Sequence, residues 1–175
     1  VKDQVPDYWR EASAILGGLA YEIHTRNRPT TKEEFTKQIK KMKEKLEELR
    51  PEHYKEHREK KKREQKEADK KHEEEIKKIE KKISDLEKEY NNEEDPYRKE
   101  ELFEIKKKLL LQIANKEKSH LQNYVFGYKI LNNIAKGKGA TELEKKDAEE
   151  IKKEALRRQK VYNEKLDKLV ERYYL

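Results

Sequence analysis

The first series of apolar residues along the chain predicts a helix over residues 7–25. Its members follow one another at steps of three and four residues, which places them on one face of a helix: Trp9, Ala12, Leu16, Leu19 and Ile23. Gly17 and Gly18 weaken this helix by about 1 kcal/mol each relative to alanine. We therefore expect another helix to pack closely here, where glycine leaves room for its backbone.

A second series has the spacing of a coiled-coil seam and predicts a helix over residues 31–49. Its apolar residues alternate four- and three-residue steps: Phe35, Ile39, Met42, Leu46 and Leu49. So narrow an apolar face needs a partner helix. Capping-box spacing marks the start of the helix at one of two pairs, Thr30 with Glu33 or Thr31 with Glu34. Pro51 should then break or kink the helix, or begin the next one, because proline has no amide hydrogen to donate.

Residues 52–75 predict a solvated helix that buries little. No aliphatic side chain larger than that of Ala68 occurs there. Acidic residues precede basic ones by four positions, as Glu56 precedes Lys60, and each such pair stabilises a helix by about 0.2–0.5 kcal/mol. The segment can therefore be helical without an apolar seam.

Two further series predict an antiparallel hairpin with helices over residues 51–91 and 97–136. Before the polar break at residues 91–96 the chain carries Ile76, Ile79, Ile83, Leu86 and Tyr90, and after it Tyr97, Leu102, Ile105, Leu109 and Ile113. When the chain reverses at the break, the two series pair in opposite order, and the numbers of each pair add to 187, 188 or 189. The seams and the turn therefore indicate one register.

A glycine-rich turn at residues 136–140 precedes a last helix, predicted over residues 141–174. Thr141 and Glu144 have capping-box spacing at its start. Its apolar residues pair with the preceding helix at numbers that add to 276: Tyr128 with Ala148, Val125 with Ile151, Leu121 with Ala155, Leu110 with Leu166, and Phe103 with Tyr173. We therefore expect the last helix to lie back along the second hairpin helix.

We predict an all-α fold: a long antiparallel coiled-coil hairpin, a third long helix packed back along it, and a small N-terminal helical base. The base comprises residues 1–50, the hairpin residues 51–136 with its turn near 91–96, and the C-terminal helix residues 137–175. Residues 121–134 are apolar on nearly every side and need at least two neighbours. Three tyrosines of the last helix are expected to pack in its seam: Tyr162, Tyr173 and Tyr174.

The composition favours elongated helices over a thick globular core. Of the 175 residues, 47% are charged and 32% are hydrophobic. The net charge of +7 lies mainly on residues 97–136, which carry nine basic and four acidic side chains. The absence of cysteine excludes disulfides and favours a reducing, intracellular compartment, without identifying it. No apolar run approaches the roughly 20 residues of a transmembrane helix, which predicts a soluble protein, and the first residue is not Met, which suggests a processed or excised fragment.

One motif resembles a zinc-hydrolase pattern. His53 and His57 flank Glu56 in the order H-x-x-E-H, in which two histidines one turn apart bind zinc. A hydrolase also needs a third ligand and a dry cleft, whereas the neighbours here are mostly charged. The chain contains no phosphate-binding loop, dinucleotide glycine pattern or nucleophile elbow. We therefore predict no catalytic residue, no metal site and no cofactor, and a protein that is not an enzyme.

Two basic clusters could contact phosphates: Lys60, Lys61, Lys62 and Arg63, and Lys106, Lys107 and Lys108. Glutamates lie within a turn or two of the first cluster, which favours an ordinary solvated face. A helix-turn-helix across the Pro29 turn would need a third helix in one compact domain. The Trp9 helix has too little lysine on its polar face to favour a membrane surface.

Taken together, the sequence predicts a non-enzymatic interaction module, a helical scaffold or adaptor that spaces or docks protein partners in a larger assembly. The partner would be another subunit or a second copy of the chain, bound through helical seams, and the expected contact residues are Trp9, Leu16, Phe35, Ile39, Met42 and Leu46. The alternative is a nucleic-acid-binding arm that uses the two basic clusters, with affinity that falls steeply as salt rises.

Overall fold

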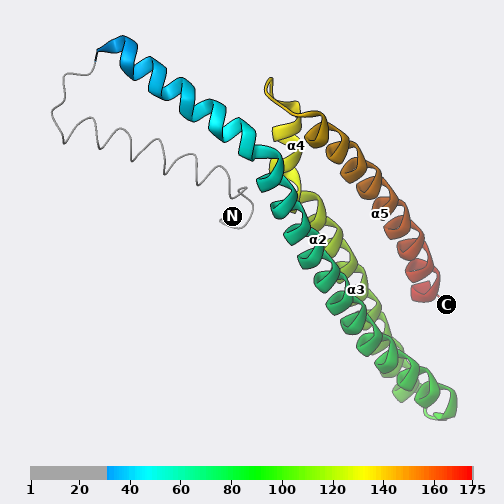
Figure 1. The fold of residues 1–175 in the computed structure, drawn as a ribbon. Helices are drawn as coiled ribbons and strands as arrows, with labels where there is room; N and C mark the ends of the chain where they lie inside the picture. Colours follow the sequence, from blue (N-terminus) through cyan, green and yellow to red (C-terminus); the bar gives the residue numbers. More distant parts are fainter. Residues whose placement is uncertain (1–30, 175) are drawn as a thin grey trace. The chain divides into compact units, whose positions relative to one another are not determined.

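The structure, a computed structural model, describes residues 31–174, except the side chains of Phe35, Gln38 and Met42. Four helices occur in this part of the chain: α2 (Lys32–Asn92), α3 (Pro96–Gly127), α4 (Lys129–Lys136) and α5 (Glu142–Tyr174) (Figure 1). Residues 31–174 contain no strand, and the predicted all-α fold is confirmed. The helix expected over residues 7–25 lies outside the described residues.

Short polar side chains begin three of these helices. The Thr31 hydroxyl accepts a hydrogen bond from the Glu34 amide at 3.2 Å, so the second of the two expected capping pairs begins α2. Asp95 caps α3, whose first residue is proline, and the Thr141 hydroxyl accepts from the Glu144 amide at 3.2 Å to begin α5. Each cap satisfies an amide that has no partner within the helix.

Of the outcomes predicted at Pro51, a break and a new helix start are wrong, because α2 runs without interruption from Lys32 to Asn92. Proline within a helix costs about 3 kcal/mol, since one backbone hydrogen bond is lost and the ring crowds the preceding turn. Three side chains around it, Arg50, Tyr54 and Arg58, are spaced four residues apart and all bond to carboxylates at the start of α5. These tertiary bonds offset the local preference for a break.

The helix predicted over residues 97–136 also differs from the structure. The helix expected over residues 97–136 is divided into α3 and α4 at Tyr128, whose φ of −102° and ψ of 2° leave the helical region. Of the apolar residues in this stretch, Tyr124, Tyr128, Leu131 and Ile134 are buried. Val125 and Phe126 are instead 52% and 57% exposed, so the expectation of burial on nearly every side was wrong for them.

The described chain divides into two compact units. The first contains residues 31–63 and 130–147, and the second contains residues 64–129 and 148–174. In the first unit α2 bonds to the opening turns of α5, and α4 buries Leu131 and Ile134. In the second unit parts of α2, α3 and α5 form a three-helix bundle.

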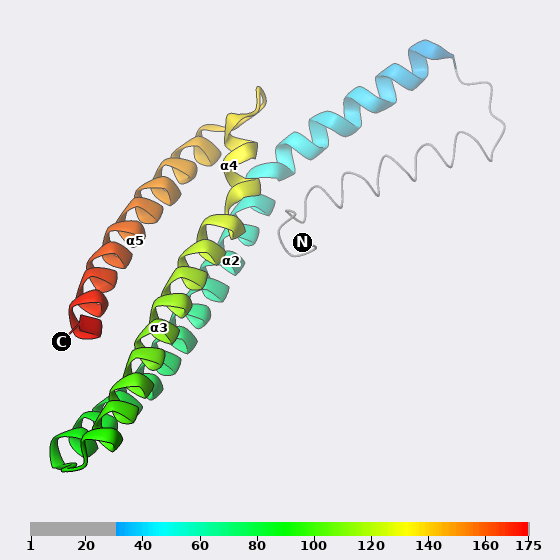
Figure 2. The ribbon, with the colours of Figure 1, turned by 180° about the vertical axis from the view of Figure 1, so that it is seen from behind.

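The core of the three-helix bundle contains residues of all three helices. Five buried side chains form its centre, Ile79, Ile83, Leu110, Ile113 and Leu169, and four partly buried ones pack around them, Ile76, Leu109, Ala114 and Tyr173. Here α2 and α3 lie side by side and antiparallel, joined by the turn before α3 (Figure 2). The predicted hairpin, with a third helix along it, is therefore confirmed.

The register of the hairpin agrees with the predicted one. His120 contacts Asp69 and His72 contacts Glu117, and both pairs of numbers add to 189. Not every expected seam residue is buried, however. Tyr90, Tyr97 and Ile105 are 37%, 81% and 40% exposed, whereas Leu102 is 1% exposed.

The register of α5 against α3 differs from the predicted one. Glu117 contacts Lys165 and the Tyr124 ring lies 4.3 Å from Arg158, pairs whose numbers add to 282 rather than 276. Leu110 and Leu169 belong to the same buried cluster, and their numbers add to 279. The α5 helix is therefore displaced from its predicted position by three to six residues, about one to two helical turns. A shift of one turn keeps the same faces in contact, and an apolar pattern alone does not distinguish such registers.

Candidate functional site

A groove between α3 and α5 exposes apolar side chains of the three-helix bundle. It has a volume of about 340 Å³ and is lined by Leu110, Leu111, Ala114, Leu166, Leu169, Val170, Tyr173 and Tyr174. We call it the α3/α5 groove. Its floor is buried, since Leu110 and Leu169 are 2% and 8% exposed. Its rim is open, since Leu111, Val170 and Tyr174 are 51%, 48% and 80% exposed.

The spacing of apolar residues explains why this groove forms. Leu166, Val170 and Tyr174 stand four residues apart on α5, next to the face that buries Leu169. On α3, Leu111 follows the buried Leu110 and so lies about 100° further around the helix. Each helix therefore has an apolar face wider than the core covers, and the two surplus edges meet at one surface.

A layer of polar side chains crosses the bundle beyond its apolar core. The rings of His72 and His120 stack in parallel, with centroids 4.1 Å apart and planes within 1°. The His120 Nε2 atom lies 2.7 Å from an Asp69 carboxylate oxygen, and the His72 Nε2 atom lies 3.0 Å from a Glu117 carboxylate oxygen. These residues occupy the positions that isoleucine and leucine fill nearer the turn. The seam therefore continues in the same register with polar contacts.

Two cations of α5 complete this polar layer. Arg158 donates two hydrogen bonds, of 2.9 and 2.8 Å, to the two oxygens of Asp69. Lys165 donates to Glu117 at 3.3 Å, so every helix of the bundle contributes to the layer. Burial alone would raise the pKa of the Asp69 carboxyl, but the hydrogen bonds from Arg158 and Gln65 hold that pKa well below its usual range. Asp69 is therefore ionised at neutral pH.

The pKa of His120 is shifted in the opposite sense from that of an ordinary ion-paired histidine. Burial lowers this pKa, and the neighbouring His72 lowers it further, while the hydrogen bond to Asp69 acts against both. The net shift is downward. A neutral ring is consistent with its stacking on a second imidazole, since two charged rings at this distance would repel each other.

A second polar cluster joins α2 to the start of α5 in the first unit. Arg50 binds both carboxylate oxygens of Glu144 at 2.6 and 2.8 Å, and Glu144 is 1% exposed. The Tyr54 hydroxyl donates to Asp147 at 2.6 Å, and Arg58 donates to the same carboxylate at 2.8 and 3.0 Å. Burial and the bond to Asp147 raise the pKa of Tyr54. The two acids also lie in the first turns of α5, where negative charge is favourable.

The expectation that residues 52–75 bury little is therefore wrong at their N-terminal end. Tyr54 and His57 are 2% and 3% exposed. The Tyr54 hydroxyl bonds to Asp147, 93 positions later, which no local pattern reveals. Between residues 31 and 174, no group of three or more His, Cys, Asp or Glu side chains is arranged to hold a metal ion. His53 and His57 therefore belong to no such group.

The structure places the predicted partner-binding residues only in part. Trp9 and Leu16 lie outside the described residues. Phe35 and Met42 belong to α2, but their side chains are outside the description. Ile39 and Leu46 are half-buried on α2. The α3/α5 groove lies elsewhere, and its signal in the sequence was the apolar surplus of α5, including Tyr174, which is exposed instead of packed in the seam.

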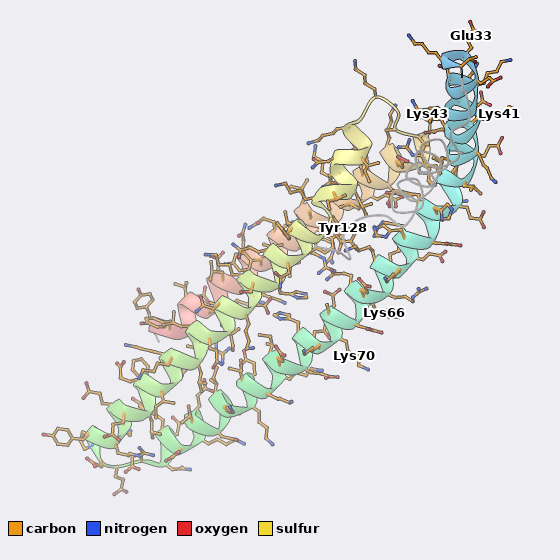
Figure 3. The ribbon with its side chains drawn as sticks, turned by 90° about the vertical axis from the view of Figure 1, so that its left-hand side faces the viewer. Glu33, Lys41, Lys43, Lys66, Lys70 and Tyr128 are labelled. Atoms are coloured by element: carbon orange, nitrogen blue, oxygen red, sulfur yellow. The ribbon has the colours of Figure 1, made fainter. Side chains whose placement is uncertain are left out.

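The two basic clusters differ in how far other groups engage them. Lys106 lies 3.3 Å from Glu87, and Lys107 lies 3.5 Å from Glu104 and stacks on the Phe103 ring. Lys108 is exposed. In the first cluster Lys61 is half-buried, whereas the other three are exposed: Lys60, Lys62 and Arg63. A solvated lysine face continues along α2, where Lys66 and Lys70 extend away from α3 (Figure 3).

Comparison of the chain with protein-family models, with curated proteins and with solved structures finds no match. Among the described helices, none is both long and apolar enough to cross a membrane.

Proposed function

We propose that this protein is a non-enzymatic interaction module, a helical scaffold or adaptor that docks the apolar face of a partner helix in the α3/α5 groove. The observation that carries the proposal is the groove itself, whose rim exposes Leu111, Val170 and Tyr174 although nearly half of the chain is charged. Contiguous exposed apolar surface on a soluble helical protein commonly marks a site of association.

The shape of the groove favours a helix as the docked element. Two neighbouring helices leave a furrow between them, and an amphipathic helix fills such a furrow with side chains at three- and four-residue spacing. The floor of Leu110 and Leu169 supplies apolar contact, and the tyrosines at one end offer both a flat ring and a hydroxyl.

The polar layer supports a scaffold by holding the bundle in one register. Asp69 bonds to His120 and Arg158, and Glu117 bonds to Lys165. A slip of one turn would separate these charges from their partners on the other helices. Breaking such pairs is costly, which makes the register specific. A surface groove built on a bundle of defined register presents its apolar side chains at defined positions.

The proposal is tested with a helical peptide of about three heptads that carries leucine at its a and d positions. Binding to the full chain is measured by fluorescence anisotropy. We expect saturable binding that weakens roughly tenfold or more in the double variant L111E/V170E, because glutamate would be buried by the peptide. Leu156→Glu is the matched control, since Leu156 is 63% exposed on α5 outside the groove.

Equal affinity of the wild type and the double variant would overturn the proposal, provided that circular dichroism shows both to be equally helical. Equal weakening by the control variant would also overturn it, since the effect would then follow from added charge and not from the groove.

A second candidate, a nucleic-acid-binding arm, is favoured by a different groove between α2 and α3. This groove has a volume of about 720 Å³, and its lining includes Lys71, Lys108 and Lys116 with the polar side chains of Gln112, Asn115, Ser119 and Asn123. Lys116 is also paired with Glu75 at 3.2 Å. Duplex DNA of mixed sequence should then bind the chain at low salt and dissociate as salt rises, and K71E/K108E should weaken that binding.

A further inference from the structure

We infer that the helix pair docked in the α3/α5 groove belongs to a second copy of this chain, so that two copies associate through this face as a two-fold symmetric dimer. The inference rests on the proposed function and names the partner of the same groove. The observation that supports the inference is the distribution of charge on the two flanks of the groove.

The α3 flank of the groove is basic. Lys108 and Lys118 are both exposed, and they stand three residues before and seven residues after Leu111. These spacings correspond to about one and two helical turns, so both lysines lie on the side of α3 that carries Leu111. Lys107, four residues before Leu111, lies 5.3 Å above the Tyr173 ring, but it is paired with Glu104 and adds little to the net charge of the flank.

The α5 flank of the groove is acidic. Asp167 is exposed and stands three residues before Val170 and seven residues before Tyr174, which places it on the side of α5 that faces outward at the groove. Glu171 is exposed four residues after Asp167 and therefore lies on the same side of α5. One edge of the apolar strip is therefore positive and the other is negative.

Only one kind of two-fold arrangement brings these edges together favourably. An axis parallel to the helices lays α3 of one copy over α5 of the other, so each basic flank meets an acidic one. An axis across the helices lays α3 over α3 and brings lysines together. The parallel axis gives a four-helix arrangement in which Leu111, Val170 and Tyr174 of both copies share one apolar layer, the packing of antiparallel bundles.

The same complementarity explains why a second copy fits better than an arbitrary amphipathic helix. A single partner helix would need acidic residues along one edge and basic residues along the other. The α3 and α5 helices of a second copy supply these charges at the separation of the groove itself. In a symmetric dimer each contact also occurs twice, so the apolar area that is buried is twice that of one groove.

The test is sedimentation equilibrium of the full chain, with two charge-reversal variants. The variant K108E/K118E makes both flanks acidic, and D167K/E171K makes both basic. We expect the wild type to dimerise, and each variant alone to dimerise roughly tenfold more weakly or not at all. An equimolar mixture of the two variants should regain the wild-type affinity, because acidic flanks then face basic ones at both contacts.

The control variant K77E/K81E reverses two exposed lysines of α2 in the same bundle and should leave dimerisation unchanged. A wild-type chain that stays monomeric, or a mixture that fails to associate better than the separate variants, overturns the inference. A dimer that L111E/V170E leaves intact overturns it as well, since the contact would then use another face.

Failure of the inference and failure of the proposed function give different results. A monomeric chain that still binds the leucine-heptad peptide in the groove retains the docking function with another partner. A monomeric chain that does not bind the peptide loses both. The peptide titration is made at chain concentrations below those at which the wild type associates, so that the two equilibria do not compete.

Discussion

At the scale of single residues, the most constrained groups are polar side chains that the helix pattern does not assign to a core. Tyr54 and Glu144 are 2% and 1% exposed, as deeply buried as the isoleucines of the bundle. Each is held by a partner of opposite hydrogen-bonding character, Asp147 and Arg50 respectively. A buried polar group stabilises a fold only while that partner remains, since an unpaired one retains its full desolvation cost.

Tyr54→Phe should therefore lower the free energy of unfolding by about 1–2 kcal/mol, because Asp147 loses one of its donors and keeps Arg58. The measurement is urea denaturation followed by circular dichroism. Tyr97→Phe is the matched control, since Tyr97 is 81% exposed, and should change the free energy by less than about 0.5 kcal/mol. Equal effects of the two substitutions would contradict a structural role for the Tyr54 hydroxyl.

His120 should make the stability of the fold depend on pH. Its folded-state pKa is lowered by burial and by His72, below the ordinary value of about 6.5. The unfolded chain then binds the proton more readily, so this contribution is present above that pH and is lost as the pH falls from about 6.5 toward the folded-state pKa. His120→Gln should flatten the fall of the unfolding free energy between about pH 7 and pH 5.

The wild type and the His120 variant are compared by urea denaturation across that range, and the His120 ring is titrated separately by NMR. Parallel pH profiles of the two proteins would contradict the prediction, since folding would then leave the pKa of His120 unchanged. A ring that titrates above the ordinary value would contradict it too, because Asp69 would then stabilise the protonated ring more than burial disfavours it.

At the scale of helices, local preference and tertiary bonding disagree at Pro51. The ring breaks the backbone hydrogen-bond pattern of α2, yet the helix continues because Arg50, Tyr54 and Arg58 all bond to the first turns of α5. At Pro96, by contrast, the same residue type stands at the first position of α3, where no amide hydrogen bond is required. The two prolines therefore make opposite contributions.

Pro51→Ala should raise the free energy of unfolding by about 2 kcal/mol, the helix-interior cost of proline less the entropy that it removes from the unfolded chain. Pro96→Ala should lower it by about 0.5–1 kcal/mol, because only the entropy term changes there. Denaturation of both variants checks the opposite signs. A loss of stability in Pro51→Ala would mean that the proline is required for the direction in which α2 runs.

At the scale of the whole molecule, the apolar core of the three-helix bundle and the polar cluster of the first unit are separate sources of stability. Ile83 is 0% exposed at the centre of the bundle core, whereas the first unit buries Tyr54, Leu131 and Ile134. Units with separate cores commonly unfold separately, and the free energies of these local unfolding events then differ.

Ile83→Ala should cost about 2–5 kcal/mol and should reduce the protection of backbone amides from hydrogen exchange mainly within the second unit, residues 64–129 and 148–174. Hydrogen exchange with mass spectrometry reports each segment. Ile105→Ala, at a side chain that is 40% exposed, should have a much smaller effect. An equal loss of protection in residues 130–147 would show that the two units unfold as one.

How much of this protein could be predicted from its sequence depended on the range of the interaction concerned. The hairpin register was recovered because two isoleucine-rich seams and one turn lie within 40 residues of each other and agree. The candidate groove was not predicted, since Leu111 and Val170 only widen apolar faces that had already been assigned to a seam. Nothing near Tyr54 indicates Asp147, its partner 93 positions later.

By itself, the sequence determined that this part of the chain is helical, that it reverses before α3, and that Thr141 caps the last helix, and it limited the first cap to Thr30 or Thr31. These features follow from spacing and from bonds within one or two turns. Only the tertiary structure decided that α2 continues through Pro51, that α5 lies about one to two turns from its expected register, and which apolar edges remain exposed. Helical periodicity repeats with every turn, so the choice among equivalent faces and registers depends on contacts between residues far apart in the chain.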